Sequence, residues 1–121
     1  MKIRQLLAIC VLTLAGTAAA PAFAHAKLVS AEPRAASQLD AAPREIRLHF
    51  NEALEPAFST IALSDASQAE IALPAAAPDK ADASTLVVAL PVLRAGSYRV
   101  RWTAMTHDGH KTKGEFGFQI K

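Results

Sequence analysis

The stretch Tyr98-Arg-Val-Arg-Trp-Thr103 alternates large apolar side chains with polar ones. Successive side chains of an extended chain point to opposite faces, so Tyr98, Val100 and Trp102 would share one face. Strict alternation of this kind predicts a β-strand with one face on a core and the other in water. We therefore expect this segment to be a strand of a sheet that is solvated on one side.

The same period of two recurs in both directions along the chain. The expected strands are 27–31, 44–50, 60–64, 71–73, 86–90, 98–103 and 115–120. Prolines and a Gly-Ser pair separate them, and 74–83 is expected to be a long surface loop. About seven short strands predict an all-β single domain, a seven-stranded Greek-key β-sandwich or barrel of immunoglobulin-like type.

The alternation also predicts which side chains are buried. The expected core members are Phe50, Leu63, Tyr98, Val88, Val100, Trp102 and Phe118. His49 falls on the polar face of its strand and is expected to be exposed. Met105 is expected to serve packing, and no helix longer than two turns is expected after residue 25.

Residues 1–24 have the features of a secretory signal peptide. Lys2 and Arg4 form a basic start, 6–15 is mostly apolar, and Ala22-Phe-Ala24 offers the small residues of a signal-peptidase site. The apolar run is shorter than the about 20 residues that span a membrane. We expect cleavage after Ala24, which makes His25 the first residue of a mature domain, 25–121; a cut after residue 20 is the alternative.

Removal of this segment changes the composition. The two bases of the signal carry the formal net charge of +2, so the mature domain is neutral. A basic surface for nucleic acid is therefore not supported. Cys10, the single cysteine, also leaves, so no disulfide or thiolate site is available. Export without cysteine fits a bacterial periplasm; no later segment is long and apolar enough to span a membrane, and we expect a monomer.

The segment Thr106-His-Asp-Gly-His-Lys111 carries two imidazoles and a carboxylate. Asp108 and His110 are two positions apart, so in extended backbone they point to the same side, which makes half of a metal site. Asp-Gly is also a turn signal, and a turn that presents both ligands satisfies both interpretations. His107 points the other way; it is expected to be a solvated bystander, with a role as an alternative or axial ligand left open.

A histidine at a free N-terminus is a chelator by itself, because its α-amine and its ring Nδ1 can hold the same metal. With Asp108 and His110, the donor set at His25 becomes three nitrogens and one oxygen. Planar or tetragonal N,O ligation suits Cu(II), whereas zinc prefers a tetrahedron. Met105 is the single methionine after the signal, so we expect one Cu(II) per chain and no dedicated Cu(I) site.

A series of short motifs runs through the mature chain in a fixed order. They are His25-Ala-Lys-Leu28, Ser30-Ala-Glu-Pro33, Leu48-His-Phe-Asn-Glu52, Leu90-Pro-Val-Leu-Arg-Ala-Gly-Ser-Tyr98, Tyr98-Arg-Val-Arg-Trp102, Asp108-Gly-His110 and Gly114-Glu-Phe-Gly-Phe118. With this series behind a signal that ends at His25, the chain resembles the CopC family of periplasmic copper-binding proteins. The resemblance covers essentially the whole mature length and implies a seven-stranded Greek-key β-sandwich that binds Cu(II).

The resemblance also implies roles for individual residues. The ligands would be the amine and ring of His25, with Asp108 and His110. Glu52 matches an acidic position that lies near the metal in relatives, where it would hold the N-terminus without binding the metal. Some relatives have a methionine-rich Cu(I) site, which this chain lacks. The implied function is sequestration or delivery of periplasmic Cu(II) in copper homeostasis or resistance, with a CopD-type inner-membrane protein as the expected recipient.

Two other functions compete with this one. Copper held by an N-terminal histidine and a second histidine also occurs in lytic polysaccharide monooxygenases, so a small copper-dependent oxidase or monooxygenase is the alternative. Those enzymes are generally larger, and Asp108 would fill the position that they leave for oxygen, so we expect no enzyme activity. A structural or adhesion sandwich without metal is the third possibility.

Overall fold

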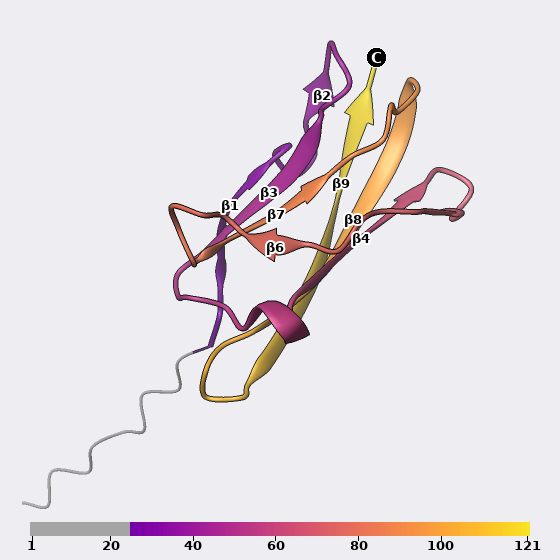
Figure 1. Cartoon of the computed structure of the whole chain (residues 1–121). Coiled ribbons are helices and arrows are strands. Elements are labelled where there is room, and N and C mark those ends of the chain that lie inside the picture. Colours follow the sequence, from indigo (N-terminus) through magenta and orange to yellow (C-terminus); the bar gives the residue numbers. More distant parts are fainter. Residues whose placement is uncertain (1–24) are drawn as a thin grey trace, which may run out of the picture.

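Two facing β-sheets form the part of the chain that the computed structural model describes, residues 25–121 (Figure 1). The predicted signal peptide, residues 1–24, lies outside the described residues. The first sheet has the strand order β1-β3-β7-β6 and the second has the order β2-β9-β8-β4-β5. The all-β sandwich predicted from the alternating pattern is therefore confirmed.

The strands differ greatly in length. In the first sheet they are β1 (Leu28–Glu32), β3 (Glu45–Phe50), β7 (Thr85–Ala89) and β6 (Ala77–Pro78). In the second they are β2 (Gln38–Leu39), β9 (Lys111–Ile120), β8 (Gly96–Met105), β4 (Thr60–Asp65) and β5 (Glu70–Ile71). The single helical segment among the described residues is a short 3-10 turn, η1 (Pro56–Phe58). None of the helical structure in 25–121 is long and apolar enough to cross a membrane.

All seven expected strands are present, but the sequence pattern missed two. β2 and β6 have two residues each, too short to show any periodicity. β6 lies in the segment expected to be a loop, because Ala77 pairs with Val87 of β7. The β8–β9 hairpin is also longer than the alternating segments, since its register runs from Gly96↔Ile120 to Met105↔Lys111.

The core between the sheets consists of the apolar faces of these strands. Five expected members, Phe50, Leu63, Val88, Val100 and Phe118, are at most 2% exposed, and Tyr98 is also buried. The expectation that Trp102 is buried was wrong, because it is only partly buried. Its ring packs edge-on against Phe50 at 5.1 Å but lies over Gly114, which has no side chain to cover it. The Tyr98 hydroxyl donates a hydrogen bond of 2.7 Å to the carbonyl of Arg94 at the far end of β8.

One end of the sandwich gathers three segments that are distant in sequence. Figure 1 shows the start of β1, η1 and the turn between β8 and β9 at this end. A bridge between Leu54 and Thr106 joins the segment before η1 to that turn. The hydroxyl of Thr112, near the start of β9, donates to the carbonyl of Ala26 at 2.8 Å, which joins the turn to the segment before β1.

Candidate metal centre

The imidazole rings of His25 and His110 lie close together at this end of the sandwich. Their centroids are 5.2 Å apart and their planes are tilted by 36°. His25 immediately precedes the buried Ala26, while His110 immediately precedes β9. The structure thus places the two histidines singled out from the sequence side by side, although they come from opposite ends of the described chain.

A tight turn presents Asp108 and His110. The amide of Gly109 donates to the carbonyl of Thr106 at 3.0 Å, and the amide of Thr106 donates to the carbonyl of His110 at 3.4 Å. Gly109 has a φ of 86°, a left-handed conformation that glycine adopts without steric cost. The Asp-Gly pair therefore acts as the turn that the sequence indicated, and it places the carboxylate next to the second histidine.

Asp108 is held in the ionised form by its neighbours. Its Oδ1 accepts hydrogen bonds from the hydroxyl of Thr106 and, at 3.0 Å, from the amide of His110. These two bonds are the largest causes that lower the pKa of Asp108 to about 2. Asp108 is therefore a carboxylate at any physiological pH and needs to lose no proton to bind a cation.

The same carboxylate contacts the ring of His110. Asp108 Oδ2 lies 3.1 Å from His110 Nδ1. A carboxylate on one ring nitrogen fixes the tautomer and the orientation of an imidazole, and a metal then binds the other nitrogen. While Asp108 contacts Nδ1, the ring of His110 has Nε2 for coordination. Asp108 itself could bind a metal only by giving up its contact with Nδ1.

The side chain of His107 is 69% exposed, which agrees with the solvated position expected of it. It is not solitary, because its Nδ1 contacts a carboxylate oxygen of Glu55. The amide of Glu55 donates to the carbonyl of Met105, the last residue of β8, at 2.8 Å. This pair was not predicted, because nothing in the local sequence relates residues on either side of η1.

Asn51 and Thr112 fasten the segment that follows His25. The amide of Lys27 donates to Asn51 Oδ1 at 2.8 Å, and the amide of Asn51 donates to the carbonyl of Lys27 at 3.1 Å. Thr112 bonds the carbonyl of Ala26. Thr112 has the same parity in β9 as the buried Phe116 and Phe118, so a polar residue at an inward position was the available signal.

Glu52 is half-buried in the bend beside Asn51. Within residues 25–121, the hydrogen bonds to Lys27 in the segment after His25 come from Asn51 and not from Glu52. The role of Glu52 in holding the N-terminus therefore stays a prediction.

His49 belongs to a separate polar cluster on β3 and β7. Its Nδ1 lies 2.9 Å from the hydroxyl of Thr85 and 3.3 Å from Asp82 Oδ2. Hydrogen bonds from the side chain and amide of Ser84, and then from Thr85, lower the pKa of Asp82 to about 2. His49 is partly exposed, as expected of the polar face of its strand.

The donor groups gathered near His25 suit a metal only in part. Among the described residues, no group of three or more His, Cys, Asp and Glu side chains is already arranged to hold a metal ion. Two imidazoles and one ionised carboxylate are present, and the fourth predicted donor is the α-amine of His25. In the uncleaved chain that nitrogen is a peptide nitrogen, so the full predicted set would be available only after cleavage and after Asp108 had turned away from His110 Nδ1.

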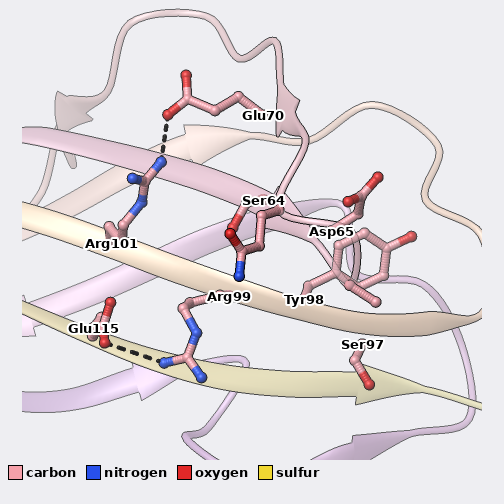
Figure 2. A pocket seen from close by; sticks show the side chains of 10 residues that line it. Ser64, Asp65, Glu70, Ser97, Tyr98, Arg99, Arg101 and Glu115 are labelled. Carbon is pink, nitrogen blue, oxygen red and sulfur yellow. Dashed lines mark hydrogen bonds and ion pairs between the residues drawn. The ribbon is translucent and has the colours of Figure 1, made fainter.

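A hollow lies elsewhere, on the outer face of the five-stranded sheet. Figure 2 shows Arg101 reaching Glu70 and Arg99 reaching Glu115 across this hollow. These are pairs of opposite charge on exposed side chains, which contribute little to stability. The predicted donors do not line this hollow, and the side chains of His110 and Asp108 are partly exposed.

Comparisons with known proteins give the family. A family model described as the CopC domain matches residues 28–121. The protein YobA of Escherichia coli K12 is 37% identical over 100 residues, which cover 82% of this chain and 81% of that protein. Copper resistance protein C of Pseudomonas syringae pv. tomato is 38% identical over 105 residues, covering 81% of this chain and 82% of the relative.

Solved structures agree with this assignment. The crystal structure of CopC from Methylosinus trichosporium OB3b superposes with a TM-score of 0.75 at 30% identity, covering 80% of this chain and 94% of the other. PcoC of Escherichia coli, described as a methionine-rich copper resistance protein, superposes with a TM-score of 0.73 at 36% identity, covering 81% and 100%. The resemblance found in the sequence motifs is confirmed: this chain belongs to the CopC family.

Proposed function

We propose that this protein is a periplasmic Cu(II)-binding protein that sequesters or delivers copper in copper homeostasis or resistance. The observation that carries the proposal is the approach of the His25 and His110 rings to 5.2 Å beside an ionised carboxylate. Relatives that share most of the chain are named copper resistance proteins. Their names support copper as the metal, and the donor chemistry supports its divalent form.

The proposed ligands are the α-amine and ring of His25, the carboxylate of Asp108 and the ring of His110. Imidazole and amine nitrogens with one carboxylate oxygen form a set that Cu(II) accepts in tetragonal geometry. Cleavage after Ala24 is part of the proposal, because it creates the amine. One Cu(II) per chain follows from one such set in a monomer.

A dedicated Cu(I) site is not part of the proposed function. Soft sulfur ligands select Cu(I), and this chain has two methionines, of which Met1 belongs to the predicted signal. PcoC, by contrast, is described as methionine-rich. The two proteins share a fold and differ in the residues that such a site would need.

We propose a binding protein and not an enzyme. The candidate centre lies at one end of a small sandwich, and as a proposed ligand Asp108 would take the position that an oxygen-activating centre leaves open. The recipient or donor of copper would be a membrane protein of the CopD type, met in the periplasm after export. An assay for ascorbate-driven oxidation of polysaccharides by the copper-loaded protein checks this, and turnover would favour the monooxygenase alternative.

Electron paramagnetic resonance of the mature protein, beginning at His25, tests the proposal with one equivalent of Cu(II). We expect a single tetragonal Cu(II) signal with nitrogen hyperfine structure from three nitrogens. A second equivalent should give the signal of weakly bound copper. A spectrum of hydrated copper at the first equivalent would contradict the proposed function.

A further inference from the structure

We propose that Asn51 and Thr112 are positioning residues: they hold the first residues of the mature chain so that His25 is presented to His110 before the metal arrives. The inference rests on the proposed function, since it concerns the same metal. Neither residue supplies a ligand to the proposed centre. Each acts on the backbone of the two residues that follow His25.

Thr112 secures Ala26. Its hydroxyl donates to the carbonyl of Ala26 at 2.8 Å, and the Ala26 side chain is buried in the core at 2% exposure. An alanine beside the end of a mature chain gains little from burial by itself, so the hydrogen bond and the core contact act together. They fix the residue next to His25 against the main body of the sandwich.

Asn51 secures Lys27 in two directions. Its side-chain oxygen accepts from the Lys27 amide at 2.8 Å, and its own amide donates to the Lys27 carbonyl at 3.1 Å. The Lys27 side chain is exposed, so these backbone hydrogen bonds and not side-chain burial hold this residue. The backbone of the two residues after His25 is therefore held by three hydrogen bonds, one from β9 and two from the bend that follows β3.

The position of Thr112 makes this arrangement relevant to the metal. Thr112 follows His110 by two residues, at the start of β9. The short segment 110–112 therefore carries the proposed ligand His110 and also the hydroxyl of Thr112. That hydroxyl binds Ala26, the residue next to the other proposed ligand, His25. We infer that this segment sets the distance between the two imidazoles. Without it, the start of the mature chain would have to be ordered when the metal binds, and that entropy cost would lower the affinity.

A matched pair of substitutions tests the role of Thr112. Thr112→Val keeps the shape and removes the donor, whereas Thr112→Ser keeps the donor. Cu(II) affinity of the mature proteins is measured by chelator competition, with thermal unfolding of the metal-free forms alongside. We expect Thr112→Val to weaken binding about tenfold, the factor that corresponds to fixing the backbone of one residue, and Thr112→Ser to stay near wild type.

Asn51→Ala provides a second variant and a readout without copper. In the metal-free wild-type protein, the amide of Lys27 should exchange slowly with solvent despite its exposed side chain, and Asn51→Ala should make its exchange fast. Copper affinity should fall by about the same factor as in Thr112→Val. Tyr98→Phe is the control, because it also removes a side-chain donor to a carbonyl, that of Arg94, but at the other end of β8.

The outcomes separate this inference from the proposed function. Wild-type binding that depends on His25, together with weakened binding in Thr112→Val and Asn51→Ala and unchanged binding in Tyr98→Phe, supports it. Wild-type affinity in both of the first two variants overturns the positioning role and leaves the proposed function in place. An equal loss in Tyr98→Phe would also overturn it, because the effect would then follow stability. A wild-type protein that binds no Cu(II) overturns both proposals.

Discussion

His25 and His110 stand at opposite ends of the described chain, yet their imidazole rings lie 5.2 Å apart. In the folded chain, the hydroxyl of Thr112 joins the β8–β9 hairpin to the segment before β1 through the carbonyl of Ala26. A metal that binds both rings binds the folded protein in preference to the unfolded chain. Such binding would raise the apparent stability of the fold in proportion to metal concentration and affinity.

The two histidines of the turn should differ in their effect on copper binding. We expect His110→Ala to weaken Cu(II) binding by about two orders of magnitude, or ~2.7 kcal/mol, because a ring nitrogen of the proposed set is lost. His107→Ala is the matched control, since the ring of His107 contacts Glu55 and is not a proposed ligand. Chelator competition on the two variants measures the difference. Equal losses would show that His107 is also a ligand.

The pH dependence of copper binding should follow the nitrogen ligands. Asp108, whose pKa is lowered to about 2 by Thr106 and the His110 amide, is ionised from pH 5 to 8 and releases no proton there. An α-amine has a reference pKa of about 8 and imidazole one of about 6.5, so binding should release protons and weaken steeply below about pH 6. Competition titrations from pH 5 to 8 measure this. A flat affinity over that range would rule out the proposed ligands.

Asp82 should make the metal-free fold sensitive to acid. Hydrogen bonds from Ser84 and Thr85 lower its pKa from 3.8 to about 2 in the folded state. A lowered folded-state pKa stabilises the fold above the unfolded value, and this contribution is lost as the pH falls from about 4 toward 2. Asp82→Asn should therefore lower the free energy of unfolding at pH 7, with a difference from wild type that shrinks toward pH 2. Urea unfolding at the two pH values tests this, and a constant difference would contradict it.

Gly114 should not tolerate a side chain. A Cβ at this position would lie 2.5 Å from Trp102 Cζ2, so the indole that packs on Phe50 would have to move. We expect Gly114→Ala to cost about 1–3 kcal/mol in unfolding free energy. Trp102 is the single tryptophan, so its fluorescence reports the displacement directly. Lys113→Ala, which alters an exposed neighbour, is the control. An unchanged fluorescence spectrum in Gly114→Ala would mean that the position of the Trp102 ring does not require the space beside Gly114.

The fold could be predicted because its strands are regular and half-solvated. The alternation in 98–103 and 44–50 marks the strands that carry Val100 and Phe50 into the core. β2 and β6 could not be predicted, because two residues carry no period and their pairing depends on β9 and β7. Trp102 was placed on the correct face, but its exposure depends on Gly114 in the neighbouring strand, which only the register of the hairpin reveals.

The candidate site was only partly predictable from sequence. Asp108 and His110 are close in sequence, and the Asp-Gly pair predicted a turn that presents both. The prediction that His25 is a ligand rested on the signal-peptidase pattern and on the family resemblance. Asn51, Thr112 and Glu55 were missed, because each acts through a contact between segments distant in sequence. A polar residue at the inward position of Thr112 is a signal that pattern reading can use in related chains.

The central claim is that the amine of His25 binds the metal, and adding one residue ahead of it tests this most directly. The mature protein and a form with an extra Met before His25 are compared by competition with a chelator of known strength. The α-amine moves away from the ring of His25, while the core strands stay as they are. We predict a loss of Cu(II) affinity of at least about two orders of magnitude, or ~2.7 kcal/mol, with unchanged thermal unfolding of the metal-free form. Equal affinities would contradict the account and show that side chains alone hold the metal.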